Sequence, residues 1–169
     1  MRINKNIKTI AIEGMAGSGK TVLIRYLTRN LLGNFSKEDF VIIGKRLDDY
    51  RHFKDLGELI ILDSENDLNS VLESILDYEK KRIIILSEMS EKDIREEFLL
   101  ISKNKKHLIL IEAQELPNEL YFDMELIGRN APLKAKARNL DLNLERGQFW
   151  VNDVILFDCP YISEDYQIL

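Results

Sequence analysis

A glycine-rich stretch near the start of the chain carries the most specific chemistry in the sequence. Residues 14–21 read Gly-Met-Ala-Gly-Ser-Gly-Lys-Thr and fit the pattern G-x-x-x-x-G-K-[ST] in full. An apolar run precedes them and a helical pattern follows, which is the context in which such a loop binds phosphate. The sequence therefore predicts a phosphate-binding loop that leads from a strand into a helix.

Each residue type in this loop has a physical task. Gly14, Gly17 and Gly19 allow positive φ and close approach of the backbone to a ligand. The loop amides and the helix N-terminus then point at an anion. Lys20 is expected to reach the β- and γ-phosphates and the Thr21 hydroxyl to ligate Mg²⁺. We expect the whole loop to hold a nucleoside triphosphate with Mg²⁺ (Gly14, Met15, Ala16, Gly17, Ser18, Gly19, Lys20 and Thr21).

Hydrolysis of that nucleotide needs one group on the magnesium side and another that orients the attacking water. Two apolar runs end in acids, one at Asp63 and the other at Ser87-Glu88. We favour the second, with Glu88 as the water-activating carboxylate and Ser87 on the magnesium side. A hydroxyl is a weaker ligand for a hard cation than a carboxylate, so Ser87 brings the rate of hydrolysis, and even turnover itself, into question.

The next apolar run ends at Gln114, whose neutral amide could contact the γ-phosphate and report its loss. We assign no chemical role to the two histidines or to the aromatic pair near the C-terminus. We expect His52 and His107 at the surface or its boundary, and we expect Phe149 and Trp150 in the core rather than in a stacking platform. No cluster of His, Cys and Asp has the spacing of metal ligands.

The elements that must position these residues alternate along the chain. Strands are expected at residues 8–14, 40–45, 58–64, 82–88 and 106–114, and helices at 20–33, 67–81 and 90–104. Ser90 and Asp93 form a variant of the capping box at the start of the last helix. Four of the strands are almost continuous in Ile, Val and Leu, as in parallel strands covered by helices on both faces. The predicted fold is α/β with a mainly parallel central sheet.

The pattern changes after the last of these strands. Residues 116–145 read as irregular, and residues 147–160 read as a hairpin with Asn152 and Asp153 near its turn. The second strand of this hairpin is expected to join the edge of the sheet.

Composition limits the class of protein. A chain of 169 residues is expected to form one domain over residues 1–169. The net charge of −5 argues against a non-specific nucleic-acid binder. The single cysteine, Cys159, fits a reducing compartment. No apolar run has the roughly 20 residues of a membrane span, and the N-terminus lacks a signal-peptide core. We therefore expect a cytoplasmic protein that meets a membrane only through a partner or a larger parent chain.

Several stretches, in this order, resemble the FtsK/SpoIIIE/HerA group of P-loop ATPases. Residues 11–32 look like the nucleotide loop and first helix of that group, and residues 65–82 look like the helix before its acidic strand. Residues 40–56 resemble its second strand, with Gly-Lys-Arg where the group often has Asp-Pro-Lys. Residues 106–117 resemble its sensor strand, with Ala-Gln where the group often has Thr-Gln. Residues 145–163 look closest to the ATPase modules of ESX-type (type VII) secretion coupling proteins.

This resemblance implies a RecA-like P-loop NTPase, a three-layer sandwich that binds ATP and Mg²⁺ and works as a motor or regulatory module. Such modules often act in rings or tandem arrays, with an arginine supplied across the interface; Arg129 and Arg138 are candidates. Some modules of the secretion branch bind nucleotide yet hydrolyse it poorly, and Ser87 agrees with that. The substrate would be a secreted protein, and the short chain suits one module cut from, or working beside, a larger protein.

Other functions stay open. A DNA translocase or conjugation-type ATPase is supported by the basic stretch at residues 128–138. A small nucleoside or nucleotide kinase could use the same loop, with that stretch as a cationic lid, although Glu88 and Gln114 suit water attack better. A GTPase is disfavoured because no Asn-Lys-x-Asp motif is present. In a non-catalytic interpretation, bound nucleotide is a structural or docking signal.

Overall fold

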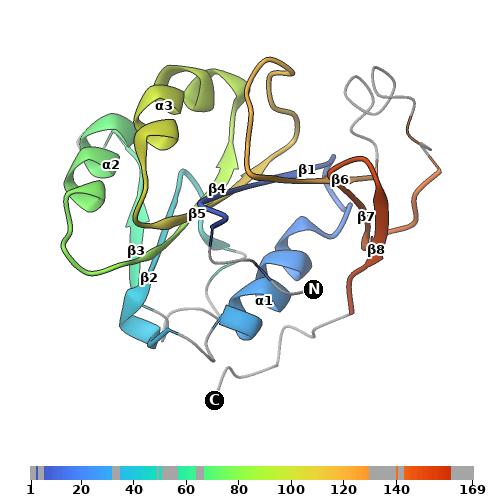
Figure 1. The fold of residues 1–169 in the computed structure, drawn as a ribbon, viewed down its shortest axis with the longest axis horizontal. Helices are drawn as coiled ribbons and strands as arrows, with labels where there is room; N and C mark the ends of the chain where they lie inside the picture. Colours follow the sequence, from blue (N-terminus) through green and yellow to red (C-terminus); the bar gives the residue numbers. More distant parts are fainter. Residues whose placement is uncertain are drawn as a thin grey trace.

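One mixed β-sheet forms the centre of the molecule (Figure 1). The computed structural model describes residues 3, 6–31, 35–48, 50, 57–63, 67–129, 140 and 143–160. Its sheet has eight strands in the order β3-β2-β4-β5-β1-β6-β7-β8. Strands β1 to β6 run parallel, so the prediction of a mainly parallel sheet is confirmed. The bounds are β1 Thr9–Glu13, β2 Phe40–Gly44, β3 Glu58–Ile61, β4 Ile83–Met89, β5 Leu108–Ala113, β6 Met124–Gly128, β7 Gln148–Val151 and β8 Ile155–Asp158.

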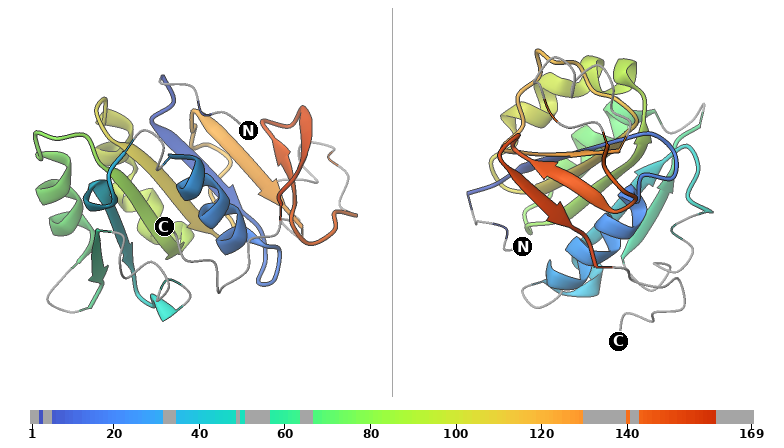
Figure 2. Two further views of the ribbon diagram at one scale, coloured as in Figure 1. Left: turned by 90° about the horizontal axis from the view of Figure 1, so that it is seen from below. Right: turned by 90° about the vertical axis from the view of Figure 1, so that its right-hand side faces the viewer.

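Helices cover both faces of the sheet, which gives the three layers of an α/β sandwich (Figures 1 and 2). Helix α1 (Lys20–Leu31) lies on one face, and α2 (Leu68–Leu76) and α3 (Glu91–Lys103) lie on the other. A short 3-10 turn, η1 (Lys37–Asp39), precedes β2. None of the helices in the described part of the chain combines the length and apolar character that crossing a bilayer requires.

Side-chain caps fix where the helices begin. The predicted capping box at α3 is confirmed, because the Asp93 backbone N–H donates to Ser90 Oγ at 3.2 Å and the Ser90 N–H donates to Asp93 Oδ2 at 3.1 Å. Asp67 caps α2 by accepting from the Ser70 N–H at 3.0 Å. Helix α2 ends at Leu76, earlier than the predicted residue 81.

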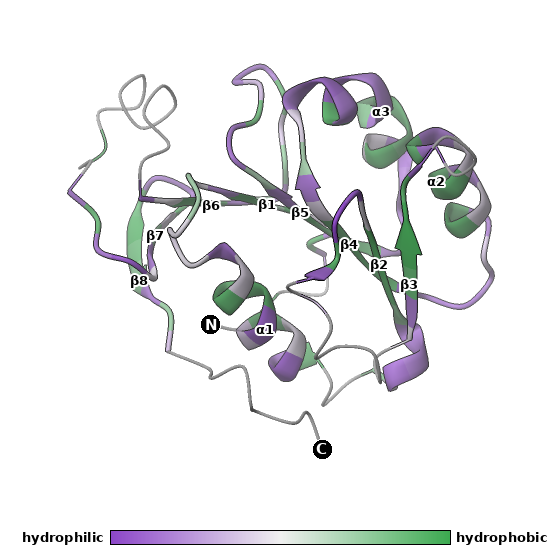
Figure 3. Cartoon of the chain, turned by 180° about the vertical axis from the view of Figure 1, so that it is seen from behind, coloured by the Kyte–Doolittle hydropathy of each residue, from purple (hydrophilic) through white to green (hydrophobic). Residues whose placement is uncertain are grey.

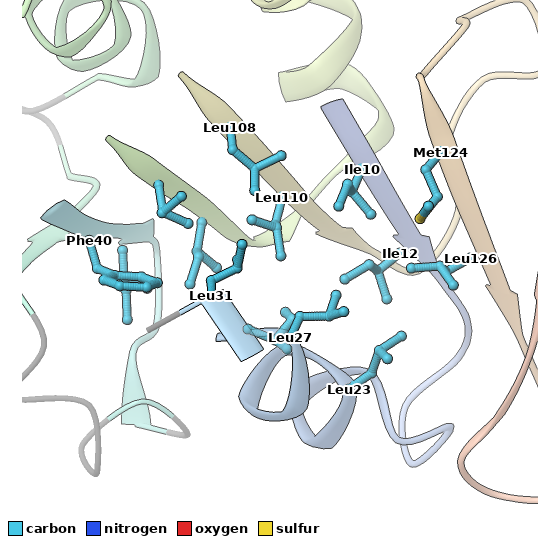
Figure 4. Packing of buried hydrophobic residues seen from close by; sticks show 14 of the residues in the cluster. Ile10, Ile12, Leu23, Leu27, Leu31, Phe40, Leu108, Leu110, Met124 and Leu126 are labelled. Carbon is cyan, nitrogen blue, oxygen red and sulfur yellow. The ribbon is translucent and has the colours of Figure 1, made fainter. Parts of the chain in front are cut away.

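Alternate residues of the central strands contribute to two apolar cores, one on each face of the sheet. Ile10 and Ile12 of β1 point toward α1, and they belong to one cluster with Leu23, Leu27 and Leu31 of that helix (Figure 4). Residues of the opposite parity pack against α2 and α3. Each fully buried Leu or Ile contributes about 2 kcal/mol. Figure 3 shows the same division, with apolar central strands and hydrophilic outer faces on the helices. Both cores lie beneath the site, and they hold the strand ends in fixed positions.

The predicted strand at residues 58–64 is present as β3, which pairs only with β2 in the described structure and has mostly exposed residues. One prediction about the strands needs correction. The segment at residues 116–145 is expected to be irregular, but it contains β6, which is buried at every position and pairs with β1. Only five residues of β6 carry the pattern, and Glu125 interrupts them, so the periodicity was too short to detect.

The C-terminal hairpin is confirmed with one change. Asn152 and Asp153 form its turn, with φ of 46° and 61°, as the mirror-image hairpin turn requires. However, the first strand, β7, joins the sheet by pairing antiparallel with β6, and β8 becomes the outer edge. Phe149 is fully buried, as predicted for a core residue.

Candidate nucleotide-binding site

The loop between β1 and α1 has the predicted geometry. Gly14, Gly17 and Gly19 have φ of 153°, 78° and 99°, values that residues with a side chain rarely adopt. The Gly14 N–H donates to the carbonyl oxygen of Gln114 at 3.2 Å. A Cβ atom at Gly14 would lie 2.6 Å from Ser18 Oγ, so the loop closes too tightly for any other residue there. The glycines therefore build a backbone cradle that fits an anion.

The ammonium of Lys20 lies at the same loop. Its Nζ donates to the carbonyl oxygens of Gly14 at 2.7 Å and Met15 at 3.3 Å. Within the described residues, no carboxylate forms an ion pair with it. Burial lowers the pKa of Lys20, and the nearby carboxylates of Glu112 and Glu88 oppose that shift. A cation held only by neutral carbonyls can exchange them for phosphate oxygens, so the residues present fit a nucleotide phosphate.

A pocket of about 600 Å³ opens beside the loop. Ala16, Lys20, Glu88 and Gln114 all line it. They come from the carboxyl ends of the parallel strands and the start of α1, the edge at which α/β sheets bind ligands. Strand β5 lies between β1 and β4, so Gln114 follows the strand between the loop and Glu88. The fold thus brings together the predicted phosphate ligand, base and sensor.

Glu88 has an unusual backbone conformation. Its φ is 52°, in the left-handed region that costs a residue with a side chain roughly 1–2 kcal/mol. The pairing of β4 with β5 shifts register between Leu86 and Met89, which sets Glu88 out of the ladder. Its side chain is exposed, while the other residues of β4 are buried. Strain of this kind concentrates at functional sites.

The predicted magnesium-side hydroxyls meet at a residue that the sequence analysis missed. Thr21 Oγ1 donates to Glu112 Oε1 at 3.3 Å, and Ser87 Oγ donates to Glu112 Oε2 at 3.1 Å. The hydroxyl of Tyr50 donates to the same Oε2 at 2.6 Å. Burial raises the pKa of Glu112, and the hydrogen bonds from Tyr50 and Ser87 and the charge of Lys20 only partly offset it.

A smaller cavity of about 160 Å³ adjoins this carboxylate. Ser87, Glu88 and Glu112 line it together with Arg46 and Asp48. Across the described ranges, no three or more His, Cys, Asp or Glu side chains form a group that could hold a metal ion. Any magnesium here must therefore take oxygen ligands from phosphates and water as well, which is how Mg²⁺ is usually bound.

The remaining sequence candidates lie elsewhere. Asp63 follows β3 at the edge of the sheet, and three strands separate β3 from β1. His107 is buried, not at the surface: Nδ1 accepts from the Arg82 N–H at 3.0 Å and Nε2 lies 3.1 Å from the carbonyl oxygen of Leu76. The backbone of Arg129 lies beside this chain's own loop, since its carbonyl oxygen accepts from the Met15 N–H at 3.3 Å. His52, Arg138 and most of the basic stretch at 128–138 lie outside the described residues.

The C-terminal hairpin also reaches the loop. The Gly147 N–H donates to the carbonyl oxygen of Ser18 at 2.9 Å, and the Cys159 N–H donates to the carbonyl oxygen of Gly147 at 2.9 Å. A Cβ at Gly19 would lie 3.1 Å from the Gly147 nitrogen. The hairpin therefore supports the outer side of the cradle.

Comparison with known proteins gives matches in structure only. No known protein-family profile and no curated protein matches the sequence. The genome packaging NTPase B204 from Sulfolobus turreted icosahedral virus 2, in complex with AMP, superposes with a TM-score of 0.63 and 12% identity over 95% of this chain and 100% of that one. ATPases 2 and 3 of EssC from Geobacillus thermodenitrificans give a TM-score of 0.65 and 12% identity over 97% of this chain and 42% of that one. At this identity the likeness shows the fold, and the chain has the α/β fold of a P-loop NTPase domain with a C-terminal antiparallel hairpin.

Proposed function

We propose that this chain is an ATP-binding motor or regulatory module of the FtsK/SpoIIIE/HerA type. The observation that carries the proposal is the gathering of Lys20, Glu88 and Gln114 around one pocket beside the glycine loop. The likeness to the EssC ATPases and to the packaging NTPase supports it, and the latter has been solved with AMP, AMPPCP and ATP-gammaS.

Each site residue has a role in this proposal. The amides of residues 14–19 and the N-terminus of α1 bind the triphosphate, and Lys20 moves from its carbonyl partners to the phosphate oxygens. Thr21 and Ser87 lie on the magnesium side. Glu88 takes a proton from the attacking water, and Gln114 contacts the γ-phosphate. Bound Mg²⁺ would neutralise charge on the phosphates.

Hydrolysis by this module is expected to be slow. Ser87 offers a neutral oxygen at a position where a carboxylate would hold a hard cation more strongly. A neighbouring module could also be needed to contribute an arginine to the site, as happens in rings and tandem arrays of such ATPases. The proposed partners are therefore other ATPase modules, joined in tandem or as separate chains.

We propose that the module belongs to a type VII protein secretion ATPase and acts on a secreted protein. The module would work in the cytoplasm or at the inner face of the cell membrane. The EssC modules support this choice, because the structural match to them includes 97% of this chain. Contact with the membrane would come through a partner or a larger parent chain.

DNA translocation is the second candidate. The packaging NTPase favours it, since the match covers that whole chain as well as 95% of this one. The net charge of −5 disfavours a protein that binds DNA non-specifically. A small nucleoside or nucleotide kinase is third, because an exposed carboxylate and an amide at the phosphate end of the pocket suit water better than a bound acceptor.

The experiment that tests the proposal is a titration of the purified protein with Mg-ATP. We expect saturable binding, and we expect Lys20→Ala to lose most of it while the fold survives. Lys105→Ala is the matched control, because Lys105 is exposed and follows α3 at the opposite end of β5 from the loop. Unchanged ATP binding in Lys20→Ala would count heavily against the proposal.

Hydrolysis is then measured with and without DNA. Stimulation by DNA that weakens as salt rises would favour translocation over secretion. We expect Glu88→Gln to keep ATP binding and to lose whatever turnover the wild type shows. Transfer of the γ-phosphate to a nucleoside or nucleotide, in place of hydrolysis, would favour the kinase.

A further inference from the structure

A buried carboxylate, that of Glu112, lies next to Ser87. In the proposed function Ser87 lies on the magnesium side of the site, where its hydroxyl is a weaker ligand than a carboxylate. Glu112 is 3% exposed, and its two oxygens accept hydrogen bonds from Thr21 at 3.3 Å and from Ser87 at 3.1 Å. A single carboxylate therefore contacts both hydroxyls that the proposed function assigns to the magnesium side.

The register of the sheet explains this contact. Leu86 of β4 pairs with Ile111 of β5, so the next residues, Ser87 and Glu112, are neighbours on adjacent strands. Leu86 and Ile111 belong to the core under α2 and α3. Because side chains alternate along a strand, Ser87 and Glu112 both point to the other face, where α1 begins with Lys20 and Thr21.

The surroundings of Glu112 could accommodate a further cation. No Lys, Arg or His side chain of the described residues forms an ion pair with it. Tyr50 donates to Glu112 at 2.6 Å and Lys20 acts on it as a nearby charge, but these only partly offset its burial. Buried carboxylates are normally paired or coordinate metals, so a metal ion beside Glu112 would lower the cost of burying it. The adjoining cavity of about 160 Å³ has room for several water molecules, each of which takes about 30 Å³ in the liquid.

We propose that Glu112 supplies the magnesium-side carboxylate that Ser87 does not, so that this acid stands on β5 instead of β4. The inference rests on the proposed nucleotide site. Mg²⁺ is commonly bound through one or two carboxylates together with phosphate oxygens and water. Glu112 holds the ion or one of its water ligands, and the hydroxyls of Thr21 and Ser87 turn from Glu112 toward the same ion.

The test compares ATP affinity in excess Mg²⁺ with ATP affinity in EDTA, using nucleotide binding and not hydrolysis as the readout. The wild type is expected to bind ATP more tightly with Mg²⁺. In Glu112→Gln, which keeps the size of the side chain, we expect the ratio of the two affinities to fall about tenfold, as loss of one strong charged interaction would cause. Affinity in EDTA should stay the same or rise, since a negative charge near the phosphates is gone.

Two further variants separate this role from a structural one. Glu125→Gln is the matched control, because Glu125 is also a buried strand glutamate but has the parity of the opposite face of the sheet. It should leave the ratio unchanged. The double variant Ser87→Asp/Glu112→Gln returns the acid to β4, where the cavity beside Ser87 gives it space, and should recover part of the ratio.

Each outcome decides the matter. A full Mg²⁺ effect in Glu112→Gln, or an equal loss of affinity in Mg²⁺ and in EDTA, would overturn the role of Glu112 while leaving the nucleotide site intact. A wild type whose ATP affinity does not depend on Mg²⁺ would also overturn the role of Glu112. A wild type that binds no ATP at all would instead overturn the proposed function. Circular dichroism of each variant confirms that it is folded.

Discussion

Replacing Glu88 with glycine is expected to make the protein more stable while removing its proposed catalytic base. The φ of 52° at this residue costs a side-chain-bearing residue roughly 1–2 kcal/mol. Glycine adopts the conformation freely, but it gives up about 0.5–1 kcal/mol in the entropy that it loses on folding. The net expectation for Glu88→Gly is a gain of about 0.5–1 kcal/mol in the free energy of unfolding. Little packing is lost, because the side chain is exposed.

Urea denaturation of wild type, Glu88→Gly and Glu88→Ala measures this effect. Alanine removes the same carboxylate but keeps a Cβ at the same φ, so the difference between the two variants isolates the backbone contribution. We expect Glu88→Ala to lie close to wild type and Glu88→Gly to lie above both, with neither variant hydrolysing ATP. If Glu88→Gly is no more stable than Glu88→Ala, the left-handed backbone costs no more than the roughly 0.5–1 kcal/mol of entropy that glycine loses on folding, and the argument that strain of about 1–2 kcal/mol is retained here for function is wrong.

Three other predictions concern stability and reactivity. Ser90→Ala should lower the free energy of unfolding by about 1 kcal/mol through loss of the α3 cap, and a Ser102→Ala control should not. Burial lowers the pKa of His107 below 6.5, among three neighbouring cations (Lys81, Arg82 and Lys106). The unfolded chain therefore binds this proton more readily than the folded protein does, so the stability that neutral His107 contributes is complete above pH 6.5 and is lost as the pH falls. Urea melts at several pH values should show that the free energy of unfolding falls less steeply below pH 6.5 in His107→Gln than in the wild type. Burial raises the pKa of Cys159 to about 11, so alkylation by iodoacetamide at pH 8 should be slow in the folded protein and fast in urea; equal rates would refute this.

The sequence was sufficient to predict the loop and most of the fold. The loop pattern and its flanking periodicity are local, and so are the Ser90 cap and the Asn152-Asp153 turn, which the structure confirms. The meeting of Glu88 and Gln114 beside the loop of Lys20 follows from a simple rule, since residues at the carboxyl ends of parallel strands meet at one edge of the sheet.

Features that depend on pairing between distant strands could not be predicted from the sequence. Glu112 lies within an apolar run, and a charge there signals a special role, but only the register with β4 and the position of α1 show that it faces Thr21 and Ser87. Tyr50 follows β2 with no pattern of its own to mark it as buried. Whether β3 lies inside the sheet or at its edge depends on strand order, which residue periodicity does not determine.

The central claim is that the backbone of residues 14–19 and the ammonium of Lys20 bind the triphosphate of a nucleotide. A crystal structure with Mg²⁺ and AMPPCP tests it most directly. We predict that the phosphates lie against the loop amides and that Lys20 Nζ has left the Gly14 carbonyl oxygen, now 2.7 Å away, for a phosphate oxygen. A nucleotide bound elsewhere, or a loop that stays empty with Lys20 still on Gly14, would contradict the account.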